Sequence, residues 1–236
     1  MGLGDTIRTL AQMPTLLKLK KGMVPRAPDV TDSFSARVEA NSLRFGHRPA
    51  IIFEGRTLTW SELNEEANRY AQYFKGQGLE RGDTVSLIME NRVEFLALLI
   101  GLNKLGVTIG LINTNLNGRP LAHCVNVTNS KKCIFGAEVA ARMEEVKAEL
   151  SLSEGEDYYV VADGDNAPSL NWAIDLDSAS HDASRDNPPD TVETTIGETA
   201  FYIFTSGTTG LPKAAVLSNR RYLISADMAA IAGFKA

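Results

Sequence analysis

The chain has 236 residues, 44% of them hydrophobic and 22% charged, which is typical of a soluble globular protein with one large domain or two small ones. Its formal net charge of −5 argues against a nucleic-acid-binding protein, which is normally basic. Two cysteines are too few for a disulfide framework, no secretory signal is visible, and the longest apolar run, residues 95–102, is too short to span a membrane. We therefore expect a cytoplasmic protein.

Residues 1–30 are predicted to form a basic N-terminal arm. Leu3, Ile7 and Leu10 have helical spacing, and five basic residues lie in the same segment before Pro28. One interpretation is weak peripheral contact of residues 1–26 with the inner, anionic face of a membrane. The other is a helix that docks on the body of the protein. At about 1 kcal/mol per basic residue, five give about millimolar membrane binding at best.

From residue 51 to residue 161, strand-like and helix-like segments alternate. The strand-like runs lie at 51–55, 84–89, 107–112, 132–135 and 158–161. The helix-like runs lie at 57–74, 92–105, from Pro120 onward, and at 137–150. Strands that alternate with helices of about ten to fifteen residues indicate an α/β fold, a layered and largely parallel sheet flanked by helices.

The first of these helices has the most complete signal. Thr59 and Glu62 have the spacing of a capping box, and Gly76 follows as a helix stop. Five apolar residues share one helical face: Leu63, Ala67, Tyr70, Ala71 and Phe74. We expect this face to be part of the core.

The alternation ends after residue 161. Residues 162–198 are predicted to be a long, acidic, solvated connection that can contain a short strand. Order returns with a strand at 199–204, and Ser218 has the position of an N-cap for a final helix over 219–234.

The strand at 199–204 runs into the loop "TSGTTGLPK", residues 205–213. A strand followed by a loop rich in glycine and hydroxyl residues can point several backbone N–H groups at one position, which favours phosphate binding. Lys213 adds a mobile positive charge. The loop does not have the G-x-x-x-x-G-K-[ST] spacing of a Walker A loop, because Gly207 and Gly210 are too close together.

The loop resembles the signature of the adenylate-forming superfamily, [ST]-[ST]-G-[ST]-[ST]-G-x-P-K after a strand, at every position from Thr205 to Lys213. The segments "LTWSELNEEANRYAQYF", "GLERGDTVSLIMENRVEFLALLIGLNKLGV" and "INTNLNGRPLAHCVNV" look like the upstream segments of the same enzymes in the same order. The N-terminal arm, residues 1–30, lies outside this resemblance. Within the superfamily, the chain looks most like long-chain and very-long-chain acyl-CoA synthetases, including the fatty acid transport protein group.

The resemblance implies a function. In that family the loop holds the β- and γ-phosphates of ATP beside Mg²⁺, a fatty acid is activated to acyl-AMP, and coenzyme A then displaces AMP. The residues that it places on the phosphates are Thr205, Ser206, Gly207, Thr208, Thr209, Gly210 and Lys213. It also places the Thr205 hydroxyl near Mg²⁺.

The resemblance also implies a limit, because members of the family are more than twice as long as this chain. We expect residues 31–236 to be the N-terminal portion of the AMP-binding domain, with its C-terminal part and the small C-terminal domain absent. The catalytic residues are then expected downstream, and the chain alone is expected to be inactive, with exposed apolar surface that favours a homodimer.

Two other functions stay open from the sequence. One is an adenylate-forming ligase for another carboxylic acid, and the other is a non-catalytic module that binds nucleotide phosphates or docks on membranes.

A metal site at His123, Cys124 and Cys133 is disfavoured, because their spacing fits no standard zinc pattern; buried cysteines are expected instead. His47 and His181 are expected on the surface.

Overall fold

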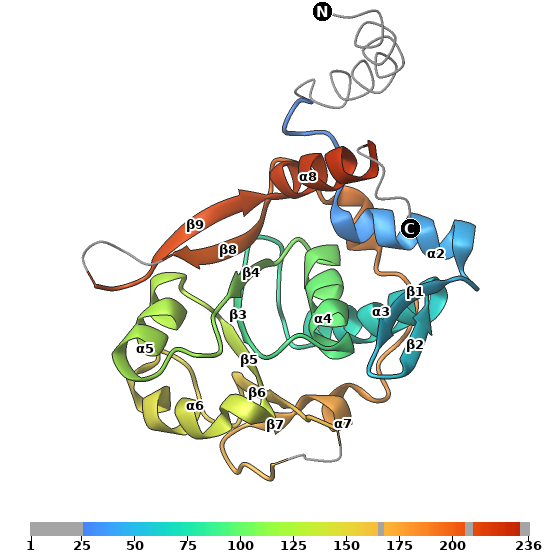
Figure 1. Cartoon of the computed structure of the whole chain (residues 1–236). Helices are drawn as coiled ribbons and strands as arrows, with labels where there is room; N and C mark the ends of the chain where they lie inside the picture. The colour runs from blue at the N-terminus through green and yellow to red at the C-terminus, as the bar shows by residue number, and fades with distance from the viewer. Residues whose placement is uncertain (1–25, 165–167, 206–209, 232–236) are drawn as a thin grey trace, which may run out of the picture.

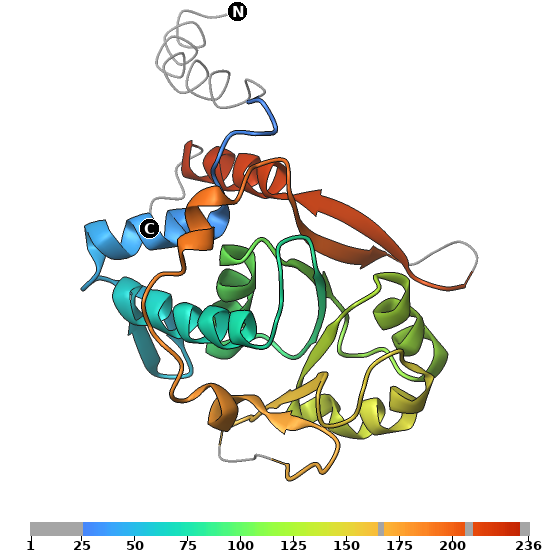
Figure 2. The same cartoon turned by 180° about the vertical axis from the view of Figure 1, so that it is seen from behind.

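The computed structural model describes residues 26–164, 168–205 and 210–231 (Figures 1 and 2). The strands are β1 (Pro49–Phe53), β2 (Arg56–Thr59), β3 (Thr84–Ile88), β4 (Thr108–Leu111), β5 (Lys132–Gly136), β6 (Tyr158–Val161), β7 (Ile174–Asp175), β8 (Thr199–Thr205) and β9 (Lys213–Ser218). The α-helices are α2 (Phe34–Phe45), α3 (Trp60–Gly76), α4 (Val93–Lys104), α5 (Gly118–Val127), α6 (Ala140–Val146), α7 (Leu176–Ser180) and α8 (Asn219–Ile231). Most of the N-terminal arm lies outside the described residues.

One sheet of seven strands organises the molecule, in the order β7-β6-β5-β3-β4-β8-β9. Every neighbouring pair is parallel except β8 and β9, which form an antiparallel pair at one edge. The strands β1 and β2 form a separate antiparallel hairpin. The prediction of a layered, largely parallel sheet is therefore confirmed.

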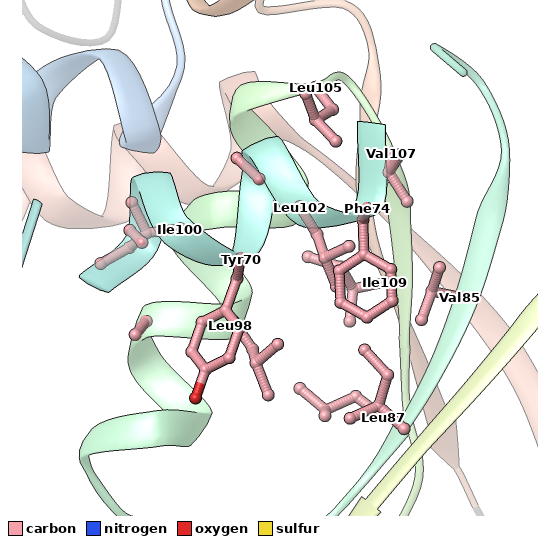
Figure 3. Packing of buried hydrophobic residues seen from close by; sticks show 14 of the residues in the cluster. Tyr70, Phe74, Val85, Leu87, Leu98, Ile100, Leu102, Leu105, Val107 and Ile109 are labelled. Atoms are coloured by element: carbon pink, nitrogen blue, oxygen red, sulfur yellow. The ribbon is translucent and has the colours of Figure 1, made fainter. Parts of the chain in front are cut away.

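Helices cover both faces of the sheet, and each face has its own core. Successive residues of a strand point to opposite faces, so Tyr159 belongs to one core and Tyr158 to the other. Helices α3 and α4 pack on the first face, where Tyr70, Phe74 and Leu98 are fully buried (Figure 3). Helices α5 and α6 cover the second face.

Helix α3 begins as its sequence predicts. The Thr59 hydroxyl accepts a hydrogen bond from the Glu62 backbone N–H at 3.3 Å, and the Glu62 carboxylate accepts one from the Thr59 backbone N–H at 2.8 Å. The five residues of the predicted apolar face are all buried. The capping box and the core face are therefore confirmed.

Several sequence predictions need correction. The run predicted as a helix over 57–74 begins as a strand, because β2 extends to Thr59 and α3 starts at Trp60. Residues 137–150 are not one helix: α6 is flanked by two 3₁₀ turns, Ala137–Val139 and Lys147–Glu149. Helix α2 precedes the first predicted strand and was not expected. Strand β9 was also missed, although α8 begins directly after Ser218 as expected.

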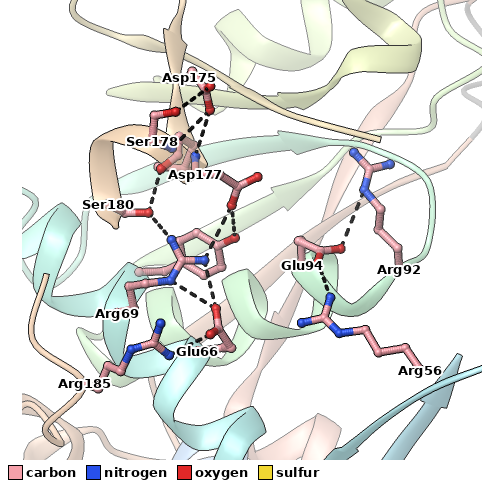
Figure 4. Close-up of polar contacts among 12 residues, drawn as sticks. Arg56, Glu66, Arg69, Arg92, Glu94, Asp175, Asp177, Ser178, Ser180 and Arg185 are labelled. Atoms are coloured by element: carbon pink, nitrogen blue, oxygen red, sulfur yellow. Dashed lines mark hydrogen bonds and ion pairs between the residues drawn. The ribbon is translucent and has the colours of Figure 1, made fainter. Parts of the chain in front are cut away.

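The connection, residues 162–198, is not a simple solvated loop. It contains β7, α7 and a 3₁₀ turn, Pro189–Glu193, and it buries Trp172 and Leu176. Its polar side chains bind α3 (Figure 4): Arg69 contacts Ser180, and the Tyr70 hydroxyl donates to Asp177 at 3.0 Å. Acidic composition predicted solvation, but one of the acids, Asp177, accepts from the Tyr70 hydroxyl and pairs with Arg69 of α3.

Candidate functional site

The two stems of the loop at 205–213 face each other across the antiparallel pair β8–β9. Thr205, the last residue of β8, is in register with Lys213, the first residue of β9. Gly210 has a φ of 96°, a backbone conformation that side chains rarely adopt, so glycine is required at this turn. Both Thr205 and Lys213 are exposed. Four predicted phosphate ligands, Ser206, Gly207, Thr208 and Thr209, lie outside the described residues.

Thr205 lies at the carboxyl edge of the parallel sheet, on a strand two places from β3, where the strand order reverses between β3 and β5. The chain passes from β3 to β4 on one side and then returns to β5 on the other side of β3. The two crossover helices, α4 and α5, consequently lie on opposite faces. In open α/β sheets the crevice at such a reversal is the usual place for a ligand.

A hollow of about 320 Å³ lies next to this reversal, on the β4 side of β3. Its walls come from the ends of β3, β4 and β8, and its polar lining residues are Glu90, Asn91, Asn113 and Thr114. A second hollow of about 300 Å³ lies beside the loop, and its lining includes Thr205, Gly210 and Pro212. The two hollows share Asn113 and Phe204. The loop stems therefore adjoin a space that extends over the carboxyl edge of the sheet.

Side chains from three crossover segments are joined by hydrogen bonds at the carboxyl edge of the sheet. The Thr114 hydroxyl donates to the Glu90 carboxylate at 2.7 Å, and the Glu90 backbone N–H donates to the Glu138 carboxylate at 2.7 Å. Arg92 donates to the same Glu138 carboxylate at 3.0 Å. Arg142 donates to the backbone carbonyls of Thr114 and Glu138. These contacts tie together the segments that follow β3, β4 and β5.

This network was not predicted from the sequence. Its signal is a polar or charged residue shortly after each strand, and that signal becomes specific only when the strands are known to be parallel neighbours. His123 was also missed, because it was considered only as a metal ligand. In the structure its Nε2 lies 3.1 Å from the carbonyl oxygen of Pro212, so α5 contacts the second stem of the loop.

The cysteines and the other histidines lie as predicted. Cys124 and Cys133 are fully buried and free, and burial raises the pKa of the Cys124 thiol to about 11. A thiol with such a pKa is a poor nucleophile and a poor metal ligand. His47 and His181 are exposed. In the described part of the chain, no three His, Cys, Asp or Glu residues are grouped so that they could hold a metal ion.

A magnesium ion could still be bound here together with a nucleotide. Mg²⁺ takes one or two protein oxygens, water and substrate phosphates as ligands. The exposed Thr205 hydroxyl is one oxygen donor, and Glu90 lines the neighbouring hollow. This donor set fits an ion that is held mainly by phosphates.

Among residues 26–164, 168–205 and 210–231, no helix has the length and apolar character needed to cross a membrane.

The chain is similar to proteins of known activity. It is 36% identical to the long-chain fatty acid transport protein 1 of Bos taurus over 182 residues, which are 74% of this chain and 27% of that protein. It is 30% identical to a medium/long-chain-fatty-acid–CoA ligase of Mycobacterium tuberculosis over 217 residues, 92% of this chain and 34% of the ligase. The chain thus spans about a third or less of the length of these relatives.

Solved structures show the same fold. A fatty acyl-CoA synthetase of Mycobacterium tuberculosis superposes with a TM-score of 0.65 at 24% identity, over 79% of this chain and 34% of that one. An anthranilate CoA ligase in complex with anthranoyl-AMP gives a TM-score of 0.75 at 20% identity, over 86% of this chain and 38% of that one. The family model described as "AMP-binding enzyme" matches residues 38–235. The chain therefore belongs to the AMP-binding enzyme family.

Proposed function

We propose that this chain is the phosphate-binding part of an ATP-dependent, AMP-forming fatty acid–CoA ligase. The observation that carries the proposal is the position of the loop: Thr205 and Lys213 face each other at the carboxyl edge of the sheet, beside the hollows at the ends of β3, β4 and β8. The names of the relatives, long-chain fatty acid transport protein and medium/long-chain-fatty-acid–CoA ligase, support a fatty acid as substrate.

The proposed reaction has two steps. A carboxylate oxygen of the fatty acid attacks the α-phosphorus of ATP, the bond from that phosphorus to the β-phosphate oxygen breaks, and pyrophosphate leaves. The thiol of coenzyme A then attacks the acyl carbon, and AMP leaves. Mg²⁺ would supply positive charge that neutralises the phosphates.

The role of this chain in that reaction is to bind and orient the β- and γ-phosphates. Backbone N–H groups that are fixed before the substrate arrives stabilise developing negative charge without further reorganisation. Among the described residues, Thr205, Gly210 and Lys213 are the proposed ligands. For Ser206, Gly207, Thr208 and Thr209 the same role stays a prediction from the sequence.

The test is binding of MgATP and of inorganic tripolyphosphate to the chain, measured by calorimetry. Both ligands should bind, and Lys213→Ala should weaken both by about tenfold or more, because a hydrogen bond to a charged group contributes about 1.5–3 kcal/mol. Lys131→Ala is the matched control, since Lys131 pairs with Asp83 at the amino ends of β5 and β3, far from the carboxyl ends where the loop lies. Equal affinities in wild type and Lys213→Ala would contradict the assignment.

We expect the 236-residue chain to bind nucleotide phosphates but not to catalyse the reaction. It covers only 27–34% of these two relatives, so the fatty acid carboxylate and the adenine lack most of their expected contacts. Pyrophosphate release from fatty acid, ATP and Mg²⁺ should be negligible. Robust release by the purified chain would show that it holds a complete active site.

Substrate range and location are further parts of the proposal. A panel of carboxylic acids in an ATP–pyrophosphate exchange assay with a longer natural protein that contains this chain would show whether long acyl chains are preferred. No acid-dependent exchange would favour the non-catalytic alternative.

A cytoplasmic location is supported by the two free, buried cysteines. Membrane contact through residues 1–26 stays a prediction, because it falls almost entirely outside the described residues.

A further inference from the structure

We propose that His123 is a positioning residue that fixes the peptide between Pro212 and Lys213 and so sets where Lys213 stands at the phosphate site. This inference rests on the proposed function, since it gives a role within the same site. The observation is the contact of 3.1 Å between the His123 Nε2 and the Pro212 carbonyl oxygen. It joins residues that are far apart in the sequence and belong to α5 and to the second stem of the loop.

The contact acts on Lys213 through the backbone. The carbonyl of Pro212 and the N–H of Lys213 belong to one planar peptide unit, so a hydrogen bond that holds the oxygen also holds the plane from which Lys213 begins. The proline ring fixes φ at Pro212 as well. Two rotations before Lys213 are therefore restricted. This restriction lowers the conformational freedom that the lysine loses when it binds an anion.

The chemistry of the pair assigns the proton. A carbonyl oxygen only accepts hydrogen bonds, so the His123 Nε2 must be the donor, in the neutral as well as in the protonated ring. A donor on this nitrogen leaves Nδ1 as the unprotonated nitrogen of the neutral ring. Residue 123 therefore needs a side chain whose N–H group reaches the Pro212 carbonyl oxygen from the helix backbone.

Helix α5 is a firm support for such a contact. On either side of His123, Ala122 and Cys124 are buried in the second core, and Val125 is 2% exposed. Pro120, one turn earlier on the same helix, lines the hollow beside the loop together with Gly210 and Pro212. One helix therefore supplies Pro120 to the lining of the hollow and, through His123, the donor that contacts Pro212, another residue of that lining.

Three variants separate this role from general stability. His123→Leu introduces an apolar side chain of similar size and removes the N–H donor. His123→Gln keeps an N–H group that can reach the carbonyl. Val125→Ala is the matched control, because it loosens the packing of α5 without contacting Pro212. Each variant is compared with wild type by backbone hydrogen–deuterium exchange over residues 210–218 without nucleotide, and by calorimetric titration with MgATP.

His123→Leu should speed exchange at these residues about twofold to tenfold and weaken MgATP binding by a similar factor, as expected for the loss of one hydrogen bond. His123→Gln should stay within about twofold of wild type in both measurements. Val125→Ala should lower the melting temperature without changing the affinity. Unchanged exchange in His123→Leu, or a glutamine variant no better than the leucine variant, would overturn the role of His123. A wild-type chain that does not bind MgATP would instead overturn the proposed function.

A measurement on the wild-type chain decides the matter if a variant fails to fold. Nitrogen-15 NMR of the imidazole rings reports which ring nitrogen carries the proton. His123 should be the Nε2–H tautomer with a slowly exchanging proton, while the exposed His47 and His181 serve as references. A His123 ring protonated only on Nδ1 contradicts the contact and overturns the proposal.

Discussion

Gly101 shows how a single side-chain atom can decide the packing of two helices. It lies in α4 where this helix meets α3, and a Cβ at this position would stand 2.4 Å from the backbone carbonyl oxygen of Ala67. A contact this short cannot be relieved by rotating a side chain, because the neighbouring atom belongs to the backbone. The close approach of α3 and α4 therefore requires glycine here.

We predict that Gly101→Ala lowers the free energy of unfolding by about 1–3 kcal/mol, the usual cost of overpacking a core. Helix propensity alone predicts the opposite sign, since alanine is favoured over glycine by about 0.5–1 kcal/mol inside a helix. Urea denaturation followed by circular dichroism gives the difference. Gly76→Ala is the control, because nothing lies within 4 Å of its added atom. Unchanged stability of Gly101→Ala would mean that α3 and α4 can separate freely.

At the scale of elements, the connection is held on the first face of the sheet by charged and polar contacts. Arg185 donates to the Glu66 carboxylate at 2.7 Å, and Arg69 donates to the same carboxylate at 2.9 Å (Figure 4). Further along, Asn187 accepts a hydrogen bond at 3.1 Å from Lys104, which is fully buried and also pairs with Glu39. Burial lowers the pKa of Lys104, although Glu39 opposes the shift.

The Glu66 contacts predict a pH dependence of stability. Burial raises the pKa of this carboxyl, but the hydrogen bonds from Arg185 and Arg69 outweigh burial and leave the pKa below its usual range. A pKa that is lower in the folded state contributes stability above the unfolded value of about 4.3, and this contribution is lost as the pH falls through the folded value. Glu66→Gln should therefore be less stable at pH 7 and lose less stability than wild type on acidification.

Thermal unfolding between neutral pH and about pH 3 measures this difference. Glu65→Gln is the matched control, because it removes the same charge from the exposed neighbouring position of α3. The control should keep the wild-type slope of stability against pH. The same slope in Glu66→Gln as in wild type would show that Glu66 is not coupled to the connection.

The sequence predicted the elements whose signals are local. The capping box at Thr59 and the continuous apolar run of α4 are read within one helix, and both were confirmed. Strand β9 was missed because its residues, KAAVLS, include two alanines of low strand propensity and become a strand only by pairing with β8. Helix α2 was missed because its apolar pattern is weak: Leu43 is 82% exposed.

The candidate site was predictable to a similar degree. The sequence predicted Thr205 at the end of a strand, which is confirmed, but it did not predict that Lys213 begins the next strand in register with Thr205. The contact between His123 and Pro212 and the network around Glu138 depend on which crossover segments become neighbours at the sheet edge. That neighbourhood follows from the strand order, which no single segment of the sequence encodes.

At the scale of the whole molecule, the edge formed by β8 and β9 exposes apolar side chains on a sheet edge. Ile203 is 41% exposed and Val216 is 52% exposed. They lie on opposite faces of the antiparallel pair, since Ile203 is in register with Ala215 and Val216 with Tyr202. β9 is the last strand of the sheet and has no charged residue from Ala214 to Ser218, so this stretch of edge strand offers unpaired backbone groups to a second copy.

We predict that the chain self-associates with increasing concentration and that Val216→Lys reduces this association, because lysine on an edge strand opposes pairing. Sedimentation velocity over a range of concentrations measures the effect. Leu43→Lys, which adds the same charge at an exposed apolar residue of α2, should leave the association unchanged. A wild-type chain that sediments as a monomer at every concentration would contradict the prediction.

The parallel pairing of β4 with β8, in which Ile109 lies opposite Phe201, has a consequence for synthesis on the ribosome. At about 5–20 residues per second, translation takes roughly four to eighteen seconds to pass from the end of β4 to the start of β8. During that interval the nascent chain can assemble the strands on the β5 side, while the other edge of β4 stays bare. The strand that carries the loop is thus inserted late, and a nascent polypeptide stalled in the connection presents an open sheet edge to chaperones.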